Sequence, residues 1–227
     1  YPDFRFVEQH LLGLVPQLLG ALSALDTDNE YVVFTNRETG TGLIPACPNF
    51  TAFPLDVRAA FRPARIVWEQ TALPLAARRK RIDVLLNPGF TAPLISPCPN
   101  VTVFHDMQHK RHPEHFRWFD LPAWRFFLWA AVRRSALVLA VSDATRRDVL
   151  SYYGLPEAKL RTVPLGVDRR FFEVGASRRE PRPYWQTWGL IMWSFMSETA
   201  AAAGRKRTRP LTGLSSQRRQ HRCRNCL

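Results

Sequence analysis

Four of the six histidines of the chain lie within eleven residues of one another, in the stretch VTVFHDMQHKRHPEHF at 101–116. These histidines are His105, His109, His112 and His115. On a helix, their spacings of four, three and three residues would align the imidazoles on one face, as in a helical metal site. Pro113 interrupts any helix there, however, and His105 with Asp106 ends an apolar strand. The pattern therefore favours a strand end followed by a loop, and we expect no metal cofactor.

His105 and Asp106 differ from the other three histidines in their place at the end of a strand. In open α/β sheets, ligands bind outside the carboxyl ends of the strands, so residues at those ends face the binding cleft. A neutral imidazole there can exchange hydrogen bonds with hydroxyl groups of a ligand, and a neighbouring carboxylate can fix its tautomer. We therefore predict catalytic roles for His105 and Asp106. The other three histidines are expected to be exposed polar residues of the loop.

The elements that must position these residues alternate between helices and strands. Apolar residues at helical spacing predict a helix over 10–26, and β-branched and aromatic residues predict a strand over 31–36. Residues 40–63 are rich in Pro, Gly and Thr and predict a long irregular connection. A helix that ends in cations is predicted over 65–81, followed by a strand and turn over 82–89.

The same alternation continues to residue 168. The further predicted elements are a strand at 100–106, a helix at 120–136, a strand at 137–142, a helix at 143–153 and a strand with its loop at 158–168. Ser142 is placed to cap the helix that follows it, and Gly154 is placed to end that helix. Strands that are apolar throughout and alternate with helices indicate a parallel sheet covered on both faces. The sequence therefore predicts a doubly wound, Rossmann-like α/β domain over residues 1–174.

The positive charge of the chain is concentrated in its last quarter. Residues 175–227 carry 11 Lys and Arg against 2 acidic residues, a net of +9, whereas residues 1–174 carry 21 against 17, a net of +4. We interpret 175–227 as an irregular basic tail, either disordered or translated out of frame, and favour the second interpretation. A basic tail can bind nucleic acid or an anionic membrane, and composition alone does not separate these partners.

The apolar segments of the sequence bear on where in the cell the protein is located. The first residues, YPDFRFVEQH, have neither the basic nor the apolar region of a secretory signal, and no apolar run is long enough to span a bilayer. We therefore expect a cytoplasmic protein, with peripheral contact at the inner face of the membrane as an alternative. The basic run Arg78–Arg81 and the aromatic run at 118–129 could rest on an anionic surface. Core packing is the favoured interpretation of the aromatic run.

Several segments occur in the order and spacing of a known family. They are an HD pair at 105–106, V-S-x-x-T-x-x-D at 141–148, Y-G-L-P-x-x-K at 153–159 and V-P-L-G-V-D at 163–168. Together with LDTDNEYVVFTN, they resemble the N-terminal domain of glycosyltransferase family 4 over most of residues 10–174. The resemblance implies one half of a GT-B fold. It also implies a retaining enzyme that transfers a sugar from a nucleotide-sugar donor, its co-substrate, to a glycan or lipid-linked acceptor.

The resemblance also implies roles for individual residues. His105 matches the strand-end histidine that lies near the transferred sugar, and Asp106 follows as its partner. The implied substrate-binding residues are Ser142 and Thr145 at the start of a helix, and Gly166 and Asp168 in the loop that leads to the second domain. For the first two, a helix-capping role is the favoured interpretation.

Two features depart from the family pattern. The chain begins at YPDFRFVEQHLLGLV, without the strand and glycine-rich loop with which family members usually begin. The second domain of the family supplies an E-x7-E pair for the donor, whereas Glu180 and Glu198 are the only acidic residues of 175–227 and do not fit that spacing. We therefore expect the acceptor-side half of such an enzyme, truncated and weakly active or inactive by itself.

The alternative function is that of a basic α/β protein which binds nucleic acid or a membrane surface without catalysis. Against nucleic acid, the Lys and Arg residues of 1–174 are scattered along the chain and form no known nucleic-acid-binding motif. The ordered set of motifs therefore makes the glycosyltransferase the favoured function.

Overall fold

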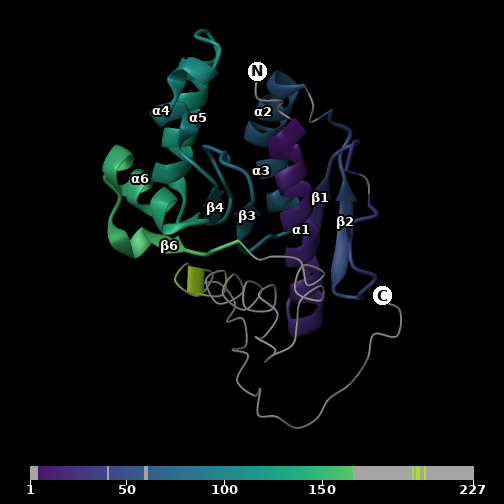
Figure 1. The fold of residues 1–227 in the computed structure, drawn as a ribbon. Coiled ribbons are helices and arrows are strands. Elements are labelled where there is room, and N and C mark those ends of the chain that lie inside the picture. The colour runs from purple at the N-terminus through teal and green to yellow at the C-terminus, as the bar shows by residue number, and fades with distance from the viewer. Residues whose placement is uncertain are drawn as a thin grey trace, which may run out of the picture.

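The computed structural model describes residues 5–39, 41–58 and 61–165, together with residues 196, 198, 199 and 202 (Figure 1). The predicted domain boundary after residue 174 and most of the predicted basic tail lie outside the described residues. None of the helices in the described ranges is long and apolar enough to cross a membrane.

A four-stranded sheet forms the centre of the fold, and all its neighbouring strands are parallel. In both spatial and chain order its strands are β3 (Leu85–Asn87), β4 (Asn100–Phe104), β5 (Leu137–Ala140) and β6 (Leu160–Thr162). Every residue of β4 and β5 is buried, as expected where helices cover both faces of a parallel sheet. The α/β fold with a parallel sheet that the sequence predicts is therefore confirmed.

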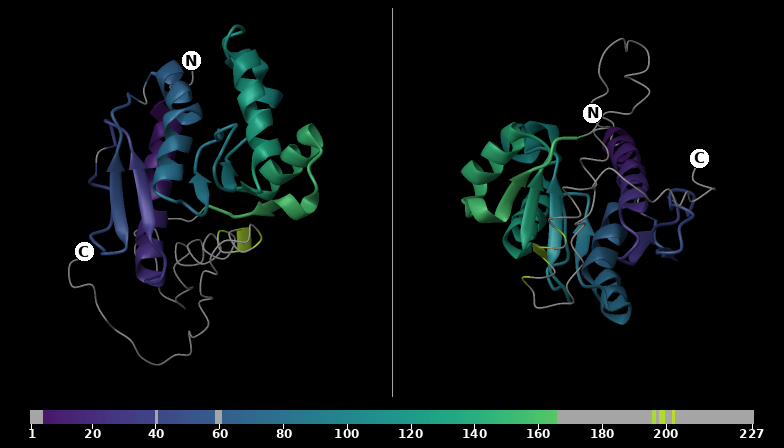
Figure 2. Two further views of the ribbon diagram at one scale, coloured as in Figure 1. Left: turned by 180° about the vertical axis from the view of Figure 1, so that it is seen from behind. Right: turned by 90° about the horizontal axis from the view of Figure 1, so that it is seen from below.

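Helices cover both faces of this sheet (Figure 2). They are α1 (Arg5–Leu25) on one face, and α5 (Leu121–Arg134) and α6 (Asp143–Tyr153) on the other. Val103 of β4 lies in one hydrophobic core with Leu22 of α1. The next residue, Phe104, lies in a second core with Leu128 of α5 and Val149 of α6. Successive residues of one strand thus enter separate cores, because a pleated strand points its side chains alternately to either face.

A second, two-stranded parallel sheet packs against the same core. Its strands are β1 (Tyr31–Thr35) and β2 (Phe50–Pro54). The paired residues Tyr31 and Phe50 stack with 4.6 Å between their ring centroids. Val33 packs in the core that also holds Val103, and Phe34 packs in another core cluster with Leu85 of β3. The two sheets therefore share hydrophobic cores on both of their faces.

The prediction of an irregular connection over 40–63 is wrong in its middle, where β2 forms. The strand has the aromatic and β-branched residues of FTAFP, which fit a pleated, half-buried surface. Pro54 has no N–H to donate to a ladder, which is tolerated at the end of a strand. Flanking Pro and Gly residues conceal this short strand in the sequence.

The single helix predicted over 65–81 is also wrong, because the structure contains two helices there. They are α2 (Arg62–Gln70) and α3 (Ala72–Arg79). Pro74 cannot donate the hydrogen bond that a continuous helix would make to the carbonyl of Gln70. Thr71 lies at the break, and its hydroxyl donates to the carbonyl of Val67 at 2.6 Å. The break places the end of α2 beside the loop that follows β3.

Candidate functional site

His105 directly follows β4, at the carboxyl edge of the sheet, and is half-buried. Its Nε2 lies 2.8 Å from the carbonyl oxygen of Pro88, in the loop after the neighbouring strand β3. A carbonyl oxygen can only accept, so Nε2 carries a proton and donates. The ring of Phe90 meets the imidazole edge-on, with 5.3 Å between centroids. These two contacts fix the tautomer at Nε2 and the plane of the ring.

The loop after β3, which contacts His105 through Pro88 and Phe90, is attached to the end of α2 by two polar side chains. Gln70 donates from Nε2 to the carbonyl of Ala92 at 3.1 Å and accepts at Oε1 from the N–H of Leu94 at 2.8 Å. The hydroxyl of Thr91 donates to Glu69 Oε2 at 2.7 Å. Burial raises the pKa of Glu69, against the opposing effect of the Thr91 hydrogen bond. Sequence reasoning missed these positioning residues, because α2 also contains Arg62 and Arg65 and nothing in the sequence distinguishes Glu69 and Gln70 from other polar helix residues.

Ser142 and Thr145 connect the start of α6 to the site. Ser142 Oγ accepts from the N–H of Thr145 at 3.1 Å, which confirms its predicted capping role. Thr145 is buried, and its hydroxyl donates to the carbonyl of His105 at 2.9 Å. Ser142 Oγ lies 3.0 Å from Thr145 Oγ1, and since that hydroxyl already donates its proton, Ser142 donates to it. This chain of hydrogen bonds ties α6 to the end of β4, and binding of a substrate by these two residues stays a prediction.

Asp106 begins the segment that carries the remaining histidines. Its Oδ1 accepts from the N–H of Gln108 at 3.1 Å, at the start of the short helix α4 (Gln108–Arg111). Arg111 ends that helix and donates from Nε and Nη2 to both carboxylate oxygens of Asp148 on α6, at 2.7 and 2.5 Å. The carboxylate of Asp106 thus faces the first turn of α4, a helix that is itself held by α6.

The prediction that His109 is an exposed loop residue is wrong. Its side chain is only 2% exposed, and Nε2 lies 2.9 Å from the hydroxyl of Tyr153 on α6. Burial lowers the pKa of His109 to about 4, and the cations of Lys110 and Arg125 act in the same direction. Burial also raises the pKa of Tyr153 to about 12, so the pair is neutral near pH 7. His109 is therefore part of the core between α4, α5 and α6.

The last two histidines of the segment are exposed, as predicted. His112 and His115 stack with 5.3 Å between ring centroids, and Nδ1 of His112 lies 3.1 Å from Glu114 Oε1. The 3-10 helix η1 (Pro113–His115) carries one of the two rings. The four imidazoles thus do not meet at one site. Where it describes the chain, the structure gathers no three His, Cys, Asp or Glu side chains in a metal-binding arrangement.

The start of α6 is also tied to β6, the strand that leads toward the remaining predicted residues. The hydroxyl of Thr162 donates to Asp143 Oδ1 at 2.8 Å. Gly166 and Asp168 follow this strand and lie outside the described residues. The carboxyl edge of the sheet therefore brings together His105, Asp106 and the first turn of α6, as the strand-end argument predicts.

Ligand binding at this edge of the sheet stays a prediction. An oriented imidazole and a carboxylate lie at a strand end, where they can exchange hydrogen bonds with hydroxyl groups of a ligand. The family model of Glycosyltransferase Family 4 matches residues 16–171, which is more than half of the chain. No curated protein matches the chain. The family match and the parallel α/β fold agree with the motifs of the sequence, and the chain belongs to glycosyltransferase family 4.

Proposed function

We propose that this chain supplies the acceptor side of a retaining glycosyltransferase, which transfers a sugar from a nucleotide-sugar donor to a glycan or lipid-linked acceptor. The observation that carries the proposal is the imidazole of His105, which is held at the end of β4 by the Pro88 carbonyl. This imidazole is only half-buried, at the carboxyl edge of the sheet, which is where ligands bind in parallel α/β folds. The family membership supports the reaction class.

In the proposed reaction His105 positions a sugar through its hydroxyl groups. The hydrogen bond to Pro88 and the contact with Phe90 set the plane of the ring before the sugar arrives, so little ordering remains at binding. Transfer develops oxocarbenium-like charge on the sugar, and we assign to the carboxylate of Asp106 the role of stabilising that charge. The proposal requires no metal ion or other cofactor.

Donor binding is the part of the proposal that this chain supplies least. Beyond residue 174 its acidic residues are Glu180 and Glu198, whose spacing does not form the E-x7-E pair that the resemblance implies for the donor side. We therefore propose that this chain binds acceptor sugars but transfers sugar slowly or not at all by itself.

The proposal is tested by nuclear magnetic resonance of the histidine rings during titration with hexose glycosides. We expect the ring signals of His105 to shift at saturation, and the Asn variant His105→Asn to lose acceptor binding. The matched variant His112→Asn changes an exposed imidazole outside the site and keeps wild-type binding. A His105 signal that no acceptor moves would contradict the site.

A second measurement tests the donor side. The chain is incubated with UDP- and GDP-linked sugars and an acceptor, and transfer is followed by release of the nucleoside diphosphate. We expect little turnover, and rapid turnover would show that donor binding is complete in this chain.

A further inference from the structure

The helix α5 and the turn before it carry an exposed row of aromatic side chains, which we call the aromatic edge. Its members are Trp118, Phe119, Phe126 and Trp129, and they are 84%, 54%, 50% and 46% exposed. Trp118 and Phe119 meet edge-on at 5.8 Å between centroids, and Phe126 and Trp129 lie 6.2 Å apart. Removing aromatic side chains of this size from water lowers the free energy, so a row of them at the surface predicts a binding site.

The aromatic edge is separate from the face of α5 that packs in the core. Leu128 and Val132 on the inner face are 0% exposed and lie in the core with Phe104 and Val149. The helix thus has an apolar face in the core and aromatic residues at its surface, whereas the outer face of a solvated helix is usually polar. The sequence-based preference for core packing of the run 118–129 is therefore wrong for these four aromatic residues.

The segment that carries the aromatic edge is positively charged. The segment 117–134 contains four arginines and a single acidic residue, Asp120, which gives a net charge of +3. The guanidinium of Arg117 lies over the ring of Phe119, 5.0 Å from its centroid. Aromatic rings among cationic side chains match the interface of a bilayer, where rings lie at headgroup depth and cations meet anionic phosphates.

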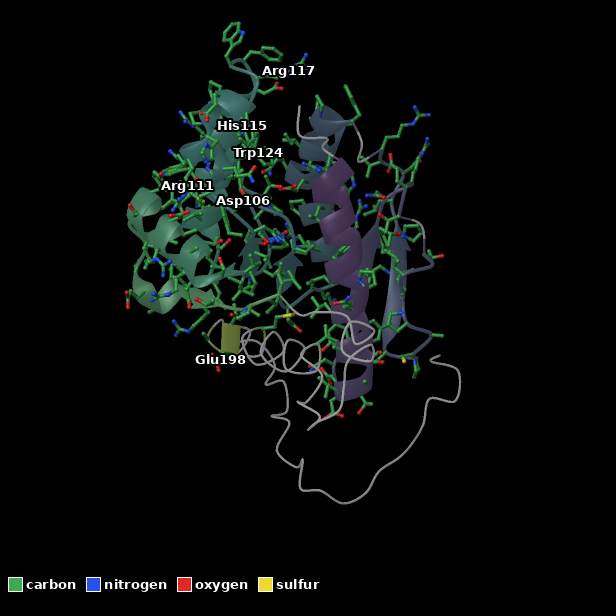
Figure 3. The ribbon with its side chains drawn as sticks, in the orientation of Figure 1. Asp106, Arg111, His115, Arg117, Trp124 and Glu198 are labelled. Carbon is green, nitrogen blue, oxygen red and sulfur yellow. The ribbon has the colours of Figure 1, made fainter. Side chains whose placement is uncertain are left out.

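The position of the aromatic edge relates it to the candidate site. In Figure 3, Arg117 lies at the top of the fold, above His115 and Trp124. Asp106 lies below them, between this tip and the sheet. The carboxyl ends of the strands face the same side, because Asp106 follows β4. A surface bound at this tip would therefore meet the edge of the sheet that carries the site.

We propose that the aromatic edge docks this protein on the surface of a bilayer that contains anionic lipids. Trp118 and Phe119 enter the headgroup region, and Arg117 contacts lipid phosphates. This orientation favours a lipid-linked acceptor over a free glycan, a preference that rests on the proposed function. Docking itself is measured without any sugar, so its failure and a failure of the proposed transfer are separate results.

The test is co-sedimentation of the full chain with vesicles made of equal parts of phosphatidylcholine and phosphatidylglycerol. The double variant Trp118→Ala with Phe119→Ala should bind these vesicles about tenfold more weakly or worse, because two rings no longer enter the interface. The conservative variant Trp118→Phe keeps a ring and should retain most of the binding. Arg117→Gln should weaken binding to these vesicles severalfold and leave binding to pure phosphatidylcholine unchanged.

A matched control separates the aromatic edge from exposed apolar residues in general. Phe61 and Ile95 are also exposed and lie outside α5 and its preceding turn, so Phe61→Ala with Ile95→Ala should bind vesicles as the wild type does. The basic segment 175–227 is the same in all variants, and the differences between them therefore measure the aromatic edge alone. Equal vesicle binding by the Trp118→Ala with Phe119→Ala variant and by the Phe61→Ala with Ile95→Ala control would overturn the proposal. If the first of these variants loses a self-association that the wild type shows in sedimentation velocity, the surface binds a second copy of the chain, which would also overturn the proposal.

Discussion

His105 and His109 stand four residues apart and have opposite surroundings. His105 is half-buried at the edge of the sheet, where the Pro88 carbonyl orients its ring. His109 is 2% exposed, and its partner is the hydroxyl of Tyr153 on α6, 44 residues later in the chain. The first imidazole keeps part of its surface exposed to solvent, whereas the second completes a core.

The difference shows that residue type and spacing do not assign a role within this segment. The strand β4 ends at Phe104, so His105 stays at the sheet edge, and the helix α4 then turns the next histidine inward. Side chains on α5 and α6 receive it there, because Tyr153 supplies a hydroxyl and Arg125 donates to the carbonyl of His109 at 3.3 Å. If this comparison is right, substitutions at the two histidines have separable effects on stability and on binding.

The largest expected effect is on stability, at His109. The substitution His109→Ala leaves a cavity in the core and the Tyr153 hydroxyl without its partner, and we expect unfolding to require about 3 to 4 kcal/mol less free energy. Urea denaturation followed by circular dichroism measures this. The control His112→Ala removes an exposed imidazole and should change stability by less than about 0.5 kcal/mol. Similar stabilities for the two variants would mean that His109 contributes little to the core.

Acid should have the next largest effect, through the same residue. The pKa of His109 is lowered from its ordinary value of 6.5 to about 4 in the folded protein, so between these values the unfolded chain binds a proton that the folded chain excludes. Its contribution to stability is therefore complete above pH 6.5 and is lost as the pH falls toward 4, by about 2 to 3 kcal/mol. Urea midpoints from pH 7 to pH 4 measure the loss. His109→Ala should remove this part of the dependence, and an unchanged slope in that variant would assign it to other groups.

At His105 we expect the reverse pattern, with a small effect on stability and a large one on binding. The substitution His105→Ala removes a half-buried ring and one hydrogen bond, which should cost about 1 kcal/mol. Acceptor binding should fall below detection. Thermal unfolding and calorimetric titration with glycosides of the same preparation measure both quantities. A loss of stability as large as that of His109→Ala would place His105 in the core as well.

The smallest effect is expected at Glu69, which positions the loop after β3 that contacts His105. Burial raises the pKa of this carboxyl, so the folded protein favours its protonated form and loses stability as the pH rises above 4.5. The substitution Glu69→Gln keeps an acceptor for the Thr91 hydroxyl and removes the charge, and should raise stability at pH 7 by less than about 1 kcal/mol. Urea midpoints at pH 4 and pH 7 measure the change. Lower stability of the variant at pH 7 would show that the charge itself is needed.

Much of the fold follows from short stretches of the sequence. Apolar runs predict β4 and β5, and the cap at Ser142 and the glycine at 154 predict the ends of α6, where Gly154 takes the left-handed φ of 59°. These features depend on residues within one or two turns of each other, which is why local pattern suffices. The strand-end rule likewise places His105 at the carboxyl edge of the sheet, because the end of a strand can be read from where the apolar run stops.

Only the tertiary structure decided the surroundings of these elements. The Tyr153 partner of His109 is 44 residues distant, and the Thr91 and Ala92 partners of Glu69 and Gln70 are 22 residues distant. The exposed face of α5 is likewise set by which side of the helix meets β4 and α6. By itself, the sequence determines which residues can form a helix, a strand or a cap. Burial, hydrogen-bond partners and pKa depend on segments that approach one another only when the chain folds.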